Sequence, residues 1–145
     1  MSPPSGRTSP APSVAVIGLG FGRAHVPAFQ AAGARVVAVC QRDEAAARKV
    51  AAAYGVPHVY PLWEQMLAAE HPEIVVVATP PHLHRVITRA ASSGGAHILC
   101  EKPLATSRED AEASVTAGLR WRAARRSPGR WRAAGAAHGH QYGQW

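Results

Sequence analysis

The hydrophobic positions of this chain fall into short continuous runs, which are separated by longer stretches of helix-forming residues. Continuous apolar runs rich in β-branched residues are typical of parallel strands that helices cover on both faces. Each run therefore predicts a buried strand. The predicted strands lie at residues 14–17, 34–40, 56–60, 73–79 and 97–101.

The stretches between these runs predict helices. The strongest of them has acids in its first turn, basic residues later and Gly55 at its end. Thr106 and Glu109 form a capping-box pattern, which predicts that a last helix opens near Ser107. The predicted helices lie at residues 25–32, 42–55, 62–70, 81–95 and from about 107 onward.

Strand and helix alternate five times, and this alternation predicts an α/β fold: a doubly wound, Rossmann-like parallel sheet with right-handed crossovers. A chain of 145 residues has room for one such domain, which we place at residues 13–117. The proline- and serine-rich residues 1–12 predict a disordered leader. Residues 118–145 are expected to form a basic, divergent or disordered tail.

The formal net charge of +7 comes mainly from the C-terminal part of the chain. Residues 1–112 hold ten basic and nine acidic residues, whereas residues 113–145 hold six arginines and no acid. Arginine and tryptophan in this tail could contact nucleic acid through phosphates and base stacking. Because the part expected to fold is nearly neutral, we do not expect a nucleic-acid partner.

No apolar run approaches the ~20 residues that a membrane-spanning helix needs, and the N-terminus lacks a hydrophobic signal region. We therefore expect a soluble, cytoplasmic protein without a membrane partner. The two cysteines, Cys40 and Cys100, each end a predicted strand. They are expected to be inert buried thiols and not a disulfide framework.

A glycine-rich sequence, GLGFG, follows the first predicted strand and opens a helix, where a Rossmann fold has its dinucleotide-binding loop. The usual G-x-G-x-x-G spacing needs glycine or alanine where this chain has Arg23. Gly18 would permit the tight turn, and Gly20, with Phe21 beside it, would let a pyrophosphate approach the backbone. Gly22 could allow close helix packing if the turn is one residue shorter. The alternative is a purely structural strand–helix turn.

The end of the second predicted strand carries Gln41, where NAD-dependent dehydrogenases place an acid for the ribose 2′-hydroxyl. Arg42 follows it. A neutral residue removes repulsion of a 2′-phosphate, and arginine offers that phosphate a charge-assisted bond, so the pair favours NADP over NAD. The alternative is that Arg42 is a solvated charge and that Asp43 caps the next helix.

Two later stretches, ATPPHLH and CEKPLA, give the sequence a clear likeness to a known family. With them the chain resembles the Gfo/Idh/MocA family of oxidoreductases, from about Ser13 to Ala111. The EKP sequence after the fifth predicted strand is far more specific than the glycine loop. The resemblance implies that Thr79, Pro80 and His84 line the cofactor site beyond the fourth predicted strand.

The resemblance also assigns roles to the EKP residues. It implies that Glu101 and Pro103 shape the nicotinamide pocket, and that Lys102 is the catalytic residue, which points at the substrate hydroxyl or at the carbonyl formed from it. Physical reasoning agrees, because ligands bind at the carboxyl ends of parallel strands. An ammonium there can donate a hydrogen bond to the reacting oxygen.

Family members continue into a substrate domain that supplies further acid–base residues and often the oligomer interface. The composition of this chain changes from about Gly118, which an out-of-frame stretch, an early stop or a genuinely divergent tail would explain, and we expect that domain to be absent. A homo-oligomer is one expectation from the resemblance. The closing GHQY sequence resembles the family's segment after the sixth strand, which would place His140 and Tyr142 near the cofactor.

The histidine pairs of the chain do not predict a metal site. His82 and His84 lie two residues apart on a predicted helix, so they point to different faces. His138 and His140 could share a metal on an extended segment, but no further ligands accompany them.

Together these features predict the nucleotide-binding domain of an oxidoreductase that uses NADP or NAD. Its substrate would be a sugar- or polyol-like hydroxyl or carbonyl. The alternative is a non-catalytic NADP-binding fragment or a redox-sensing module. Because the substrate domain is not expected, we predict that the chain binds cofactor but turns over little.

Overall fold

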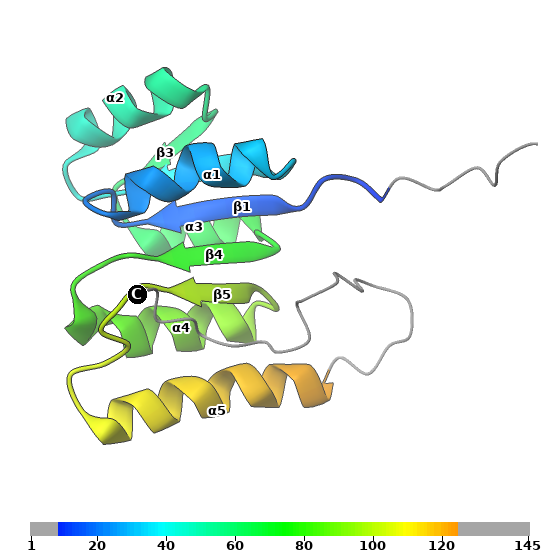
Figure 1. Cartoon of the computed structure of the whole chain (residues 1–145), viewed down its shortest axis with the longest axis vertical. Helices are drawn as coiled ribbons and strands as arrows, with labels where there is room; N and C mark the ends of the chain where they lie inside the picture. Colours follow the sequence, from blue (N-terminus) through cyan, green and yellow to red (C-terminus); the bar gives the residue numbers. More distant parts are fainter. Residues whose placement is uncertain (1–8, 125–145) are drawn as a thin grey trace, which may run out of the picture.

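The computed structural model describes residues 9–124, which form a parallel sheet with helices on both faces (Figure 1). Every continuous apolar run of the sequence becomes a strand, which confirms the five predicted strands. The strands are β1 (Ser13–Ile17), β2 (Arg35–Cys40), β3 (His58–Tyr60), β4 (Ile74–Val77) and β5 (His97–Cys100).

A helix follows each strand, as the alternating pattern predicts. Helix α2 shows most clearly which local interactions fix where a helix begins and ends. The Asp43 carboxylate accepts a hydrogen bond from the Ala46 N–H at 3.0 Å at its start, and Gly55, with a φ of 66°, ends it. The helices are α1 (His25–Ala31), α2 (Glu44–Tyr54), α3 (Trp63–Glu70), α4 (His84–Ser93) and α5 (Arg108–Ala124), with the 3₁₀ turns η1 (Gly22–Ala24) and η2 (Pro81–Leu83) before α1 and α4.

The strands are hydrogen-bonded in the order β3-β2-β1-β4-β5, and all of them run parallel. The chain proceeds outward from β1 to β3, returns to the other side of β1 and continues outward through β5. This order confirms the predicted doubly wound α/β sheet. The direction in which the chain adds strands changes between β1 and β4, which makes this position the topological switch point. In such sheets, ligands bind at the carboxyl ends of the strands at the switch point.

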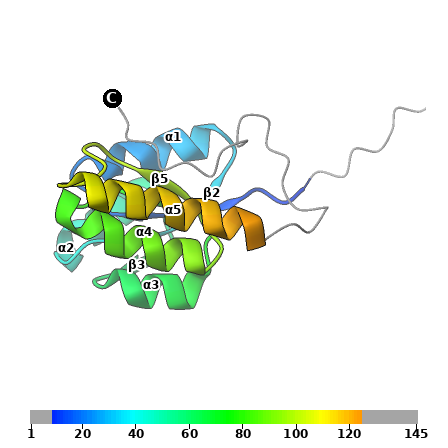
Figure 2. The same ribbon diagram turned by 90° about the horizontal axis from the view of Figure 1, so that it is seen from below.

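The sheet carries a hydrophobic core on each face, because alternate side chains of a strand point to opposite sides. On one face Val16 packs in a buried cluster with Val26 of α1 and Ala47 of α2. On the other face Ile17 packs in a second cluster that includes Met66 of α3. Figure 2 shows α1 and α3 on opposite sides of the strands.

Helix α5 packs along α4 and extends the molecule beyond the sheet (Figures 1 and 2). The hydroxyl of Ser107 accepts a hydrogen bond from the Asp110 N–H at 3.1 Å, so Ser107 is the N-terminal cap of α5. The predicted capping box of Thr106 and Glu109 is therefore wrong by one residue, because the hydroxyl that reaches the free N–H groups belongs to Ser107.

The division into leader, domain and tail stays a prediction. Just before β1, the carbonyl of Pro12 accepts a hydrogen bond from the Arg35 N–H at 2.9 Å. At the other end, α5 continues to Ala124, past the boundary that we placed at residue 117. Residues 1–8 and 125–145 lie outside the part that the structure describes.

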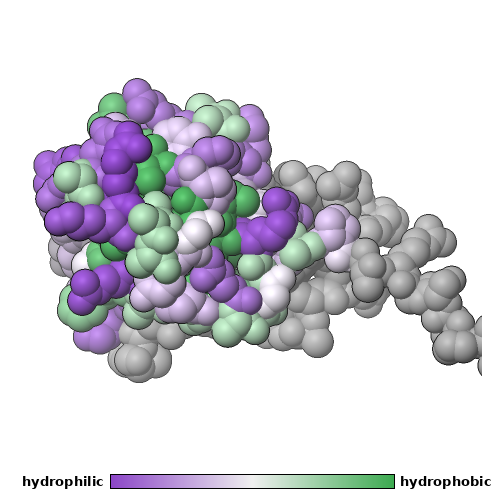
Figure 3. Space-filling view, turned by 90° about the horizontal axis from the view of Figure 1, so that it is seen from above, coloured by the Kyte–Doolittle hydropathy of each residue, from purple (hydrophilic) through white to green (hydrophobic). Residues whose placement is uncertain are grey.

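In that part, no helix has both the length and the apolar character that a bilayer crossing requires. Figure 3 views the molecule from the side of α1 and α2. On this face hydrophobic residues form small patches separated by hydrophilic ones. Small separate patches of this kind are ordinary on a protein surface.

We predict that both cysteines resist alkylation in the folded protein. Burial raises the pKa of Cys40 to about 12, with a further contribution from Glu64, and burial raises the pKa of Cys100 to about 12, aided by Glu101. Both thiols are therefore protonated at pH 8.5, and they are 3% and 0% exposed. Mass spectrometry after iodoacetamide treatment should find no label on the native protein and two labels in guanidinium chloride. Stoichiometric labelling of the native protein would contradict the burial of these side chains.

Candidate functional site

The carboxyl ends of β1, β4 and β5 lie side by side at one edge of the sheet, on the left of Figure 1. Three loops leave this edge, after Ile17, Val77 and Cys100. In the loops after Val77 and Cys100, the hydrogen bonding between neighbouring strands continues for one more residue. The Ala78 N–H donates to the Ile17 carbonyl, and the Glu101 N–H donates to the Val77 carbonyl, both at 2.8 Å. The first residues of these loops are thereby held at strand spacing.

The glycine loop touches the loop after β4 at Gly18. This residue has a φ of 85°, and a Cβ atom there would lie 2.5 Å from the Ala78 carbonyl oxygen and 2.9 Å from the Thr79 nitrogen. Its own N–H donates to the Cys40 carbonyl at 2.9 Å. Only glycine combines this left-handed conformation with so close a backbone approach.

The two other glycines of the loop differ in their surroundings. A Cβ at Gly22 would meet the Ala78 Cβ at 3.0 Å and the Val16 Cγ1 at 3.1 Å, so this glycine provides the close helix–strand packing that we expected of it. A Cβ at Gly20 would meet nothing within 4 Å. Phe21 is 85% exposed. Among the described residues, the N–H groups of Gly20 and Phe21 have no hydrogen-bond partner and remain able to bind an anion.

The end of β2 is tied to the glycine loop by Gln41. Its side-chain carbonyl accepts a hydrogen bond from the Leu19 N–H at 3.1 Å. Asp43 caps α2, as one of our two interpretations predicted. Arg42 is exposed, and its guanidinium has no partner among the described residues. It is therefore available to a ligand at this edge.

After β4, the structure separates the two histidines of the TPPHLH sequence. His82 is exposed, whereas His84 is fully buried. The His84 ring lies between two backbone carbonyls, with Nε2 2.7 Å from the Thr79 oxygen and Nδ1 3.1 Å from the Leu104 oxygen. His84 therefore joins two loops of the site and presents no surface to a ligand. Pro80 is exposed at the same edge.

Thr79 brings a polar atom to the edge of the sheet that the protein does not satisfy. Its Oγ1 is buried and has no hydrogen-bond partner in the described part of the chain. A buried hydroxyl without a partner is uncommon, and a bound ligand is one way to supply the missing bond.

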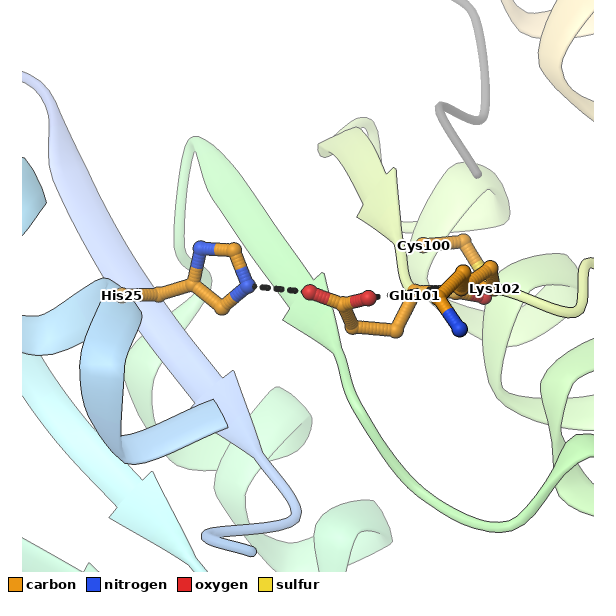
Figure 4. Close-up of polar contacts among 4 residues, drawn as sticks. All are labelled: His25, Cys100, Glu101 and Lys102. Carbon is orange, nitrogen blue, oxygen red and sulfur yellow. Dashed lines mark hydrogen bonds and ion pairs between the residues drawn. The ribbon is translucent and has the colours of Figure 1, made fainter. Parts of the chain in front are cut away.

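The EKP sequence follows β5 and is held by its own glutamate (Figure 4). Glu101 Oε1 lies 2.7 Å from Nε2 of His25, and Oε2 accepts a hydrogen bond from the Lys102 N–H at 3.3 Å. The Lys102 side chain is exposed, and its ammonium has no partner within the described residues. The Lys102–Pro103 peptide bond is cis.

Sequence reasoning missed His25. The available signal was its place in the first turn of the helix after the glycine loop, three residues beyond Gly22. Its partner, Glu101, is 76 residues away in the sequence. Only the order of β1, β4 and β5 brings the two side chains together.

The structure thus brings all the predicted site residues except Gln41 and Arg42 to the β1–β4–β5 edge, and these two lie beside it at the end of β2. His138, His140 and Tyr142 lie outside the described residues. Within residues 9–124 no group of three or more histidine, cysteine, aspartate or glutamate side chains could hold a metal ion.

A parallel sheet of this order with a glycine loop at its topological switch point is typical of a dinucleotide-binding domain. Residues 13–119 match the model of the Gfo/Idh/MocA oxidoreductase family, described as an oxidoreductase family with an NAD-binding Rossmann fold. The chain belongs to this family and contains its NAD-binding domain.

Curated relatives include D-xylose 1-dehydrogenase (NADP(+)) 2 of Haloferax volcanii, which is 40% identical over 61% of this chain and 27% of its own length. Inositol 2-dehydrogenase 1 of Saccharopolyspora erythraea is 40% identical over 67% of this chain and 30% of its own. The chain thus spans less than a third of the length of these two relatives.

Solved structures agree with this assignment. An oxidoreductase domain protein from Kribbella flavida has a TM-score of 0.74 and 30% identity, and the match covers 80% of this chain and 33% of that one. The WlbA dehydrogenase of Chromobacterium violaceum, crystallised with NADH and UDP-GlcNAcA, has a TM-score of 0.74 and 29% identity, covering 79% and 34%.

We predict that substitutions at Gly18 and Gly20 separate stability from binding. Gly18→Ala should lower the free energy of unfolding by at least about 1–2 kcal/mol, because its left-handed φ and the Ala78 carbonyl both oppose a Cβ. Gly20→Val should change stability little, yet strongly weaken NADPH binding by blocking the backbone. Urea unfolding and calorimetry measure the two effects. Unchanged NADPH affinity in Gly20→Val would remove the loop from the site.

Proposed function

We propose that this chain forms the cofactor site of an NADP-dependent oxidoreductase that moves a hydride to or from a sugar- or polyol-like hydroxyl or carbonyl. The observation that carries the proposal is the glycine loop at the topological switch point. Gly20 leaves its backbone open there, and the Arg42 guanidinium at the neighbouring strand end has no partner among residues 9–124. The D-xylose and inositol dehydrogenases among the relatives support the substrate class.

The residues present suit a dinucleotide. The N–H groups of Gly20 and Phe21, which have no partner in the described segment, would bind the pyrophosphate, since backbone donors at a helix entry favour anions. Gln41 carries no charge that would repel a 2′-phosphate, and Arg42 would bind that phosphate. Thr79 Oγ1, which has no hydrogen-bond partner in the described part of the chain, would provide a further hydrogen bond at the same edge.

At the other end of the site, we assign Lys102 the role of contacting the reacting oxygen of the substrate. When bound, the nicotinamide ring supplies the hydride chemistry. The Lys102 ammonium would donate a hydrogen bond to the substrate oxygen and stabilise the charge that develops on it. Pro80, Glu101 and Pro103 would shape the space around the ring, and His84 would act through the two loops that it joins.

The cellular location, the substrate class and the oligomeric state of the protein belong to the same proposal. We assign it to the cytoplasm and to a small sugar-like substrate. β3 and β5 form the edges of the described sheet, and unpaired edge strands favour association. Homo-oligomer formation is therefore also proposed, and light scattering tests it.

Arg42→Ala should weaken NADPH binding about tenfold or more, because a charged hydrogen bond contributes roughly 1.5–3 kcal/mol. NADH affinity should change little. Arg89→Ala, which removes another exposed arginine from α4, is the matched control and should leave both affinities unchanged. Calorimetry with the two cofactors measures the effect. Equal losses for NADPH and NADH would show that Arg42 serves the fold.

Lys102→Met should leave the NADPH dissociation constant within about twofold, because the ammonium faces the substrate and not the phosphates. Any oxidation of NADPH by a panel of sugar and polyol carbonyls should disappear in this variant. Absorbance at the nicotinamide band measures turnover, and fluorescence measures binding. Binding without turnover in the unmodified chain would favour the non-catalytic binding module. A chain that binds neither NADPH nor NADH would refute the proposed function.

A further inference from the structure

The segment that carries Lys102 is attached to the protein at both ends by histidines. On its C-terminal side, the buried His84 lies 3.1 Å from the carbonyl oxygen of Leu104. On its N-terminal side, His25 lies 2.7 Å from the carboxylate of Glu101. Between these two points no hydrogen bond or ion pair with residues 9–124 holds the Lys102 side chain. The placement of Lys102 therefore depends on the two anchors.

The two anchors differ in kind. His84 is fully buried and belongs to the packing between the loops after β4 and β5. His25 stands at the beginning of α1, and its partner follows β5, with β4 between the two elements. Adjacent strands are about 4.8 Å apart, so β1 and β5, which precede His25 and its partner, lie roughly 10 Å apart in the sheet. Figure 4 shows the imidazole pointing across this gap at the carboxylate.

The chemistry of the contact fixes the direction of the hydrogen bond. A carboxylate can only accept, so Nε2 of His25 carries the proton and donates to Oε1. The side chains are 17% and 19% exposed, which shields this bond from water more than the bonds of surface pairs. The second oxygen of the same carboxylate accepts the Lys102 N–H. One rigid planar group therefore connects the start of α1 to the backbone of Lys102.

We propose that His25 is a positioning residue, which orients Glu101 and thereby sets where Lys102 stands relative to the glycine loop. The inference rests on the proposed function for its consequence in catalysis, but the geometric claim concerns the protein alone. Without the histidine, the carboxylate would lose its bridging partner and turn toward solvent. The Lys102 backbone would then lose the oxygen that it contacts.

A matched pair of variants isolates the bond from the size and polarity of the side chain. His25→Gln places an amide N–H near the position of the ring Nε2, so it can still donate to Glu101. His25→Asn is equally polar but ends near the position of Nδ1, too short to reach. The control is His58→Asn, the same substitution on the edge strand β3 away from the site, where Nδ1 of His58 lies 2.7 Å from Glu70.

The chain permits a direct view of Lys102, because Lys49 on α2 is the only other lysine. Reductive methylation with ¹³C-formaldehyde keeps the charges and gives one NMR signal for each lysine besides the N-terminal amine. Lys49→Arg assigns the signals, and Lys49 serves as an internal reference in every sample. The spectra are recorded on the full 145-residue chain without cofactor, after thermal unfolding has shown that each variant folds.

We expect the Lys102 signal to move in His25→Asn, to return toward its original position in His25→Gln, and to stay in place in His58→Asn. The Lys49 signal should not move in any of them. An unmoved Lys102 signal in His25→Asn, or an equal shift in His25→Gln, would overturn the inference. If His25→Asn does not fold, Glu101→Asp takes its place, since it shortens the other side of the bond and should move the same signal.

Measurements of NADPH binding use the same variants. The NADPH dissociation constant should rise about three- to tenfold in His25→Asn, because the displaced Glu101 would no longer shape the space around the nicotinamide, and it should recover in His25→Gln. Should the unmodified chain bind neither NADPH nor NADH, the proposed function fails. The Lys102 spectra would still decide whether His25 positions this segment.

Discussion

The close approach of two backbones at Gly18 is the constraint on which the rest of this molecule depends. A Cβ at this position would lie 2.5 Å from the Ala78 carbonyl oxygen, nearer than atoms tolerate. Because Gly18 has none, the loop after β1 can turn directly against the loop after β4. The turn brings Gly22 onto the end of the sheet and lets η1 and α1 begin beside it, with Gly20 open to solvent.

Around that contact, individual side chains connect one strand end to another. Gln41 joins the end of β2 to the glycine loop, and His84 joins the loops after β4 and β5. His25 joins the start of α1 to Glu101. Apart from the local bond of His84 to Thr79, these hydrogen bonds link residues of different βα units, so each one forms only when the strands that precede its two residues lie together in the sheet. The edge of the sheet is thereby built from bonds between loops, while the two hydrophobic cores lie beneath it.

The electrostatics of this edge follow from which groups the protein leaves unsatisfied. The Glu101 carboxylate has a partner for each of its oxygens, whereas the guanidinium of Arg42 and the ammonium of Lys102 have none within the described residues. The two free cations stand at strand ends on either side of the glycine loop. An anionic dinucleotide, with the reacting oxygen of a substrate near its nicotinamide end, suits this distribution of charge.

The fold could be predicted from the sequence because it depends on local and periodic information. Continuous apolar runs, capping residues such as Asp43 and a turn glycine such as Gly55 gave the number, type and order of the elements. The glycine loop and the EKP sequence located the candidate site. The pairing of His25 with Glu101, the burial of His84 between two carbonyls and the shift of the cap to Ser107 could not be predicted this way. They depend on which side chain reaches a partner in space, and for His25 and Glu101 that partner lies two strands away in a sheet whose neighbours are not consecutive in the sequence.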